Sequence, residues 1–120
     1  MDETQRAALL GTDLLLASRL RAALSAEGAG LIEATRDDLL PPMPLLFVDL
    51  NHEPDARVEA ITRLRTRNPS AKIVGFCNHD ERELIRRAVA AGADHVVANR
   101  HLTGAALRLL HGPNAGRPAG

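Results

Sequence analysis

Short apolar runs alternate with amphipathic segments along the whole chain. The runs cover residues 6–10, 29–34, 45–49, 72–77 and 94–98. Apolar runs of this length, bounded by glycine, proline or polar residues, are typical of buried strands. The residues from Leu45 to Val48 are all apolar, which is the pattern of a central parallel strand covered on both faces. The pattern therefore predicts five strands.

Between these runs, apolar residues recur at helical spacing. The spacing predicts helices over residues 14–27, 55–68, 81–91 and 103–110, with residues 78–80 as capping candidates for the third. Residues 36–40 have room for a single helical turn, because Pro41, Pro42 and Pro44 follow at once. The predicted apolar helix positions are Leu16, Leu20 and Leu24; Val58, Ile61 and Leu64; and Leu84, Ile85, Ala88 and Val89.

Strands that alternate with helices predict an α/β fold of three layers. We expect a doubly wound, five-stranded parallel sheet with right-handed crossovers and a shortened second helix. Residues 1–110 are predicted to form one domain, with no output domain in the chain. Residues 111–120 are rich in glycine and proline and carry few apolar residues, so a disordered tail is expected there.

The charge balance narrows the choice of partner. The 120 residues include 15 basic and 15 acidic side chains, so the formal net charge is zero and no basic tract is available for nucleic acid. No apolar run approaches the roughly 20 residues that span a bilayer. Cys77 is the only cysteine, which excludes an internal disulfide. We expect a soluble, cytoplasmic protein that binds neither nucleic acid nor membrane.

Parallel sheets present their ligand sites at the carboxyl ends of the strands. Asp49 closes the third run, and Asp13 follows the first, where it is predicted above all to cap the next helix. Three histidines also follow strands, so a zinc or nickel site is an alternative for this rim. Its candidate ligands are Asp13, Asp49, His52, Cys77, His79 and His101.

Two segments resemble the receiver domain of two-component response regulators. They are Leu46-Phe47-Val48-Asp49-Leu50-Asn51 and Arg87-Ala88-Val89-Ala90-Ala91-Gly92-Ala93-Asp94. The resemblance implies a flavodoxin-like fold with strand order 2-1-3-4-5. It also implies that Asp49 stands at the phosphoacceptor position and that Asn51 stands where the family's backbone carbonyl helps to hold magnesium.

The remaining receiver positions depart from the family's pattern. The acidic pair after the first strand falls on Gly11 and Thr12, with Asp13 one place late. The Ser/Thr position falls on Cys77, and the lysine position falls on Asn99. Magnesium needs carboxylate oxygens and a transferring phosphoryl group needs cations. The resemblance therefore implies a pseudo-receiver without a cofactor, in which Mg²⁺ would bind only if the acidic pocket is functional.

The arginines of the second and third predicted helices are interpreted first as solvated surface. Arg57, Arg63, Arg65 and Arg67 are spread over more than one helical face, while Glu83 can pair locally with Arg86 or Arg87. In receivers, the fourth helix, fifth strand and fifth helix form the surface that meets partners. By resemblance, that face would include Arg86, His95 and Arg108.

The primary hypothesis is a stand-alone receiver-like signalling module that acts by protein–protein interaction and independently of phosphorylation. Its partner would be a histidine kinase, an output protein or a second copy of the chain. One alternative is a single-domain response regulator phosphorylated at Asp49 by a histidine kinase. Another is a small-molecule binder that uses the strand-end crevice, although no glycine-rich phosphate loop follows a strand. An enzyme is not expected, because no nucleophile, base and orienting group stand out as a set.

Overall fold

A computed structural model describes residues 5–78 and 81–111 of the chain. Within them, five parallel strands form one sheet in the order β2-β1-β3-β4-β5. The strands are β1 (Gln5–Leu10), β2 (Gly30–Ala34), β3 (Leu45–Asp49), β4 (Lys72–Cys77) and β5 (His95–Ala98). The α/β class and the strand order that the resemblance implied are both confirmed.

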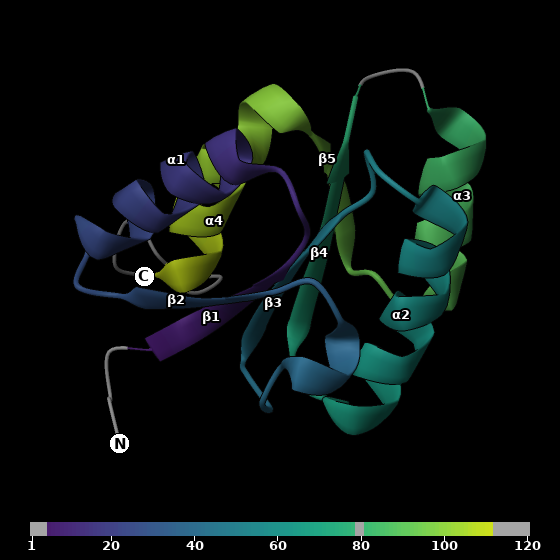
Figure 1. The fold of residues 1–120 in the computed structure, drawn as a ribbon, viewed down its shortest axis with the longest axis horizontal. Helices are drawn as coiled ribbons and strands as arrows, with labels where there is room; N and C mark the ends of the chain where they lie inside the picture. Colours follow the sequence, from purple (N-terminus) through teal and green to yellow (C-terminus); the bar gives the residue numbers. More distant parts are fainter. Residues whose placement is uncertain (1–4, 79–80, 112–120) are drawn as a thin grey trace, which may run out of the picture.

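Helices cover both faces of the sheet (Figure 1). The helices α1 (Leu14–Ser25) and α4 (Leu102–Leu110) pack on one face, where Leu20, Phe47 and Phe76 are buried together. The helices α2 (Pro54–Arg67) and α3 (Arg82–Ala91) pack on the other, where Leu46 and Ile61 are buried. Alternate residues of β3 enter opposite cores, as the unbroken apolar run predicted.

The second helix of the family is reduced to one 3₁₀ turn, η1 (Asp37–Leu39), as the prolines predicted. Asp37 ties this turn to α2. Its carboxylate accepts two hydrogen bonds from Arg63, both 2.9 Å long, and another from Arg67. The hydrogen bonds from Arg63 hold the pKa of Asp37 below its ordinary value.

Three sequence-based predictions about side chains need correction. Val89 was placed on the apolar face of α3 but is 51% exposed, because α3 packs at the edge of the helix layer and buries only a narrow stripe. Residues 78–80 do not supply an observed cap: the N-cap is Glu81, without a side-chain hydrogen bond, while His79 and Asp80 lie outside the described residues. Arg57 and Arg65 are not solvated surface residues. Arg57 is buried, and Arg65 clamps the loops around Gly92.

The ends of the chain are described only in part. Residues 112–120, most of the predicted disordered tail, lie outside the described residues. The preceding His111 is described, and its Nε2 lies 2.8 Å from a carboxylate oxygen of Glu27. No helix in the described ranges is long and apolar enough to cross a bilayer.

Candidate functional site

The candidate site lies at the carboxyl ends of β1, β3, β4 and β5, with Asp49 at its centre. Asp49 is the last residue of β3 and is only 1% exposed. Its Oδ1 accepts hydrogen bonds from the backbone amide and the side-chain amide of Asn51, each 2.8 Å long. Its Oδ2 is inaccessible to solvent and has no hydrogen-bond partner among the described residues. A buried oxygen without a donor is costly, so a bound water, a cation or a nearby donor is expected to satisfy this atom.

Three asparagines link the strand ends around Asp49. The side chains of Asn51 and Asn99 exchange hydrogen bonds of 3.0 and 3.1 Å. Asn99 also donates to Asn78 Oδ1, and the backbone amide of Asn78 donates to Asn51 Oδ1. This asparagine network, made of Asn51, Asn78 and Asn99, joins the loops after β3, β4 and β5. It is neutral and therefore supplies no cation to a phosphoryl group.

The loop after β1 brings no acidic side chain close to Asp49 at positions 11 and 12, and the packing of Gly11 leaves no room for a larger residue. A Cβ atom built on Gly11 would lie 2.8 Å from the Cβ atom of Asp49, so the chain after β1 passes directly over the carboxylate. Thr12 is exposed. Asp13 is the N-cap of α1, as predicted: its Oδ1 accepts a 3.0 Å hydrogen bond from the amide of Leu16.

Cys77 is a buried free thiol at the end of β4. Burial raises the pKa of this thiol, and the carboxylates of Glu81 and Asp49 raise it further. A raised pKa keeps the protonated form and removes the thiolate that reactivity requires. In the receiver pattern this position carries a hydroxyl, which a thiol replaces only as a weak donor.

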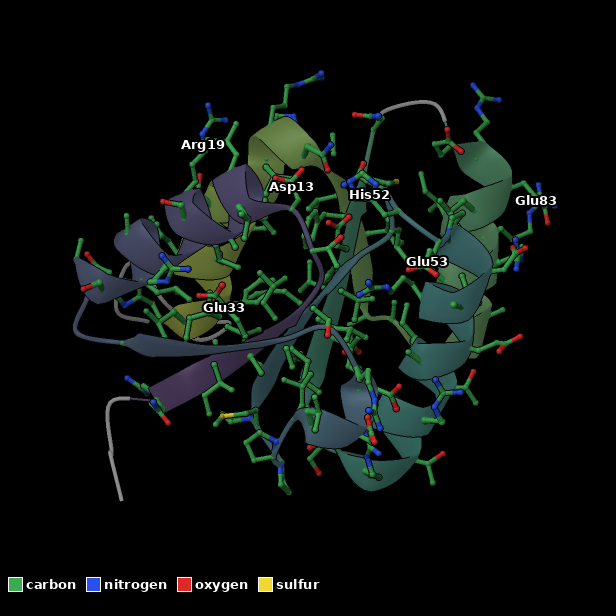
Figure 2. The ribbon with its side chains drawn as sticks, in the orientation of Figure 1. Asp13, Arg19, Glu33, His52, Glu53 and Glu83 are labelled. Atoms are coloured by element: carbon green, nitrogen blue, oxygen red, sulfur yellow. The ribbon has the colours of Figure 1, made fainter. Side chains whose placement is uncertain are left out.

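The structure brings together three of the proposed metal ligands. One ligand atom each from Asp13, Asp49 and His52 lies within 4.8 Å of the other two, and Figure 2 shows Asp13 and His52 facing the same rim. His101 and Cys77 are not part of this group, and His79 lies outside the described residues. Two carboxylates and an imidazole suit zinc or nickel better than magnesium, which prefers oxygen ligands alone. The family's magnesium is therefore a poor fit to these residues.

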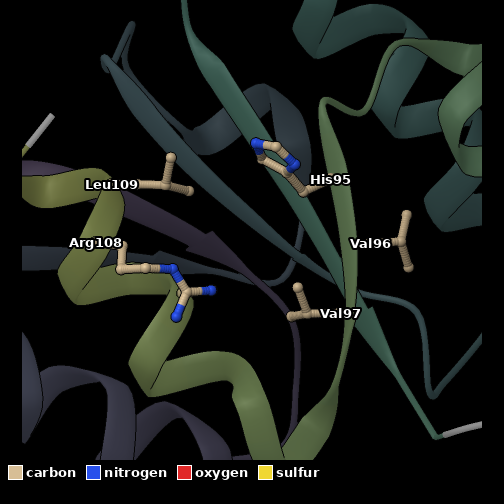
Figure 3. A pocket seen from close by; sticks show the side chains of 6 residues that line it. His95, Val96, Val97, Arg108 and Leu109 are labelled. Atoms are coloured by element: carbon tan, nitrogen blue, oxygen red, sulfur yellow. The ribbon is translucent and has the colours of Figure 1, made fainter. Parts of the chain in front are cut away.

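Of the three residues predicted for the interaction face, His95 and Arg108 lie together and Arg86 lies elsewhere. His95 of β5 and Arg108 of α4 line one cavity of about 220 Å³, together with Val97 and Leu109 (Figure 3). Arg86 lies on α3 and does not line this cavity. It pairs instead with Glu83, 2.8 Å away, as the spacing predicted, whereas Arg87 pairs with Asp55.

Sequence reasoning missed the asparagine network. Asn78 was considered only as a helix cap, and Asn99 only as the loss of a lysine. The signal was available, since an asparagine follows each of three successive parallel strands and their carboxyl ends meet at one edge. Sequence reasoning also missed Arg57, because its position on an otherwise charged helix gives no sign that it is buried.

No family model and no curated protein matches the sequence. Solved structures do resemble it. A response regulator from Burkholderia pseudomallei, with a phosphorylated aspartic acid, a calcium ion and citrate, superimposes with a TM-score of 0.77 at 21% identity over 92% of this chain and 68% of its own. A response regulator from Thermotoga maritima gives a TM-score of 0.73 at 20% identity, over 88% of this chain and 96% of its own.

A CheY-like protein, TadZ, from Pseudomonas aeruginosa gives a TM-score of 0.72 at 19% identity. The match covers 97% of both chains, so it includes all five strands. The strand order agrees with this likeness. The chain therefore has the flavodoxin-like fold of response-regulator receiver domains.

Proposed function

We propose that this protein is a receiver-like signalling module that acts through protein–protein contacts and does not depend on phosphorylation of Asp49. The asparagine network is the observation that carries this proposal. Asn99 replaces a lysine by a neutral amide that is already bonded to Asn51 and Asn78. A transferring phosphoryl group needs cations on its oxygens, and this network offers none.

The other candidate is a response regulator phosphorylated at Asp49. Two observations favour it: Asp49 Oδ2 has no partner, and Asp13 and His52 lie within reach of a shared cation. Against it, Asp49 is almost completely buried, and the chain at Gly11 passes over its side chain. A phosphodonor would have to displace that loop.

Treatment with acetyl phosphate and Mg²⁺ separates the two candidates. We expect intact-mass spectra of the wild type and of Asp49→Ala to show the same absence of a phosphoryl adduct. A receiver with a complete acidic pocket is the positive control. An adduct that is labile to hydroxylamine, present in the wild type and absent from Asp49→Ala would establish phosphorylation and refute the proposal.

The face that we propose for the protein partner lies between β5 and α4. Arg108 and His95 are exposed there beside partly buried apolar side chains, Val97 and Leu109. A cationic and apolar surface suits a partner that presents acidic side chains around an apolar centre. A histidine kinase, an output protein or a second copy of this chain could supply such a surface.

Charge reversal at Arg108 tests this face. We expect Arg108→Glu to weaken binding of the partner at least tenfold relative to the wild type, because a negative charge at this position repels an acidic partner. Sedimentation velocity measures self-association, and affinity capture followed by titration measures a heterologous partner. Arg19→Glu, at an exposed position on α1, is the control. Equal losses in both variants would show a general charge effect and remove the assignment of this face.

A further inference from the structure

A cavity opens on the α2 and α3 face, where a single 3₁₀ turn takes the place of a helix. It has a volume of about 280 Å³ and lies between the ends of β1 and β2, the turn η1 and the first turns of α2. Its polar and charged lining residues are Thr35, Arg36, Asp37, Glu53, Arg57 and Arg63. Its volume is below the roughly 300–1,000 Å³ of sites for drug-sized ligands, so its ligand must be small.

Arg57 is the unusual residue in this cavity. It is 5% exposed, and its Nη1 is inaccessible to solvent and has no hydrogen-bond partner within residues 5–78 and 81–111. A buried guanidinium without an acceptor is strongly unfavourable, because it loses hydration and gains nothing in return. Arg57 belongs to the first turn of α2 and is part of the cavity lining.

The other arginines that line the cavity are already paired among the described residues. Arg63 donates two hydrogen bonds to Asp37, and Arg36 donates two to Asp38. Glu53 is exposed, and no ion pair between its carboxylate and Arg57 is found among the described residues. The N-terminus of α2 also faces this side without a side-chain cap. Helix N-termini favour anions, so the backbone adds to the charge of Arg57.

We propose that this cavity binds a small oxyanion of the phosphate class, either inorganic phosphate or a phosphomonoester, with Arg57 as its buried ligand. A phosphate oxygen would accept the hydrogen bond that Nη1 lacks, once a small shift of the Arg57 side chain brings this atom to the cavity wall, in the charge-assisted geometry that guanidinium groups favour. The lining of this cavity does not include Asp49. The proposed site is therefore separate from the phosphoacceptor position and does not depend on the proposed function.

Thermal unfolding tests the site with inorganic phosphate and with glycerol 3-phosphate, each against chloride at equal ionic strength. At a hundredfold excess over Kd, we expect the wild-type Tm to rise by about 5 °C or more. Arg57→Met should lose this rise, while Arg19→Met, a matched change at an exposed arginine on the opposite face, should keep it. In chloride alone, Arg57→Met should unfold at an equal or higher temperature, since it removes an unpaired buried charge.

The two probes distinguish the sources of the anion. A larger Tm rise with glycerol 3-phosphate than with phosphate assigns the site to a phosphomonoester, and the reverse assigns it to free phosphate. No rise with either probe, or an equal rise in Arg57→Met, overturns the proposal. If Arg57→Met does not fold, amide NMR of the wild type gives the answer. Phosphate must then change the amide chemical shifts of Leu10, Thr35 and Ala56. Changes spread evenly over the chain would overturn the site.

Discussion

Replacing Arg65 by methionine is expected to lower the free energy of unfolding by about 3 kcal/mol. The guanidinium of Arg65 donates to the carbonyl oxygens of Gly92 and Ala71 at 2.8 Å, and to a carboxylate oxygen of Asp94 at 2.6 Å. It also reaches the carbonyls of Asn68 and Pro69. These bonds hold the α2–β4 and α3–β5 loops together, and methionine removes all of them at once, although Asp94 Oδ2 keeps the hydrogen bond from the amide of Ile73.

Arg86→Met is the matched control for this measurement. Arg86 has a single ion pair, with Glu83, and its side chain is 75% exposed, so its loss should change the free energy of unfolding by less than about 0.5 kcal/mol. Urea unfolding of the three proteins at one pH, with equal m values, gives the comparison. If Arg65→Met lowers the free energy of unfolding no more than Arg86→Met does, the hydrogen bonds of Arg65 to the two loops contribute nothing to stability.

The role of Arg65 shows where sequence reasoning about the fold reaches its limit. The strands Leu45–Asp49 and Lys72–Cys77 were predicted at their observed bounds, because the apolar runs end abruptly at polar or proline residues. The charged face of α2 gave no such signal. Its four arginines carry the same charge on one helix, yet one is buried, one binds two loops and two donate to Asp37. Tertiary contacts alone separate these roles.

The candidate site was predictable in its position but not in its geometry. The end of β3 fixed Asp49 at the carboxyl edge of the sheet, and Asp13 was correctly interpreted as a helix cap. Whether Asp49 is accessible depends on how closely the loop after β1 passes over it. That distance follows from the packing of Gly11, which no local pattern expresses.

Gly11→Asp, which places an acidic residue where receivers carry one, is expected to lower the free energy of unfolding by about 3 kcal/mol and to leave Asp49 unphosphorylated. A Cβ atom at position 11 would lie 2.8 Å from the Cβ atom of Asp49, so one of the two loops must move. The aspartate also brings a second carboxylate beside a buried one, and like charges at this distance repel. Urea unfolding and intact mass after acetyl phosphate treatment measure the two effects.

Two alanine variants separate the steric part from the electrostatic part. Gly11→Ala should cost about 1–3 kcal/mol through the Cβ contact alone. Gly104→Ala on α4, where the nearest atom is 3.7 Å away, should instead stabilise the protein by up to about 1 kcal/mol, as alanine does in a helix. If Mg²⁺ restores the stability of Gly11→Asp and Asp49 then accepts a phosphoryl group, the loop over Asp49 is adaptable. In that case one substitution separates this chain from a working receiver, and burial of Asp49 would no longer argue against its phosphorylation.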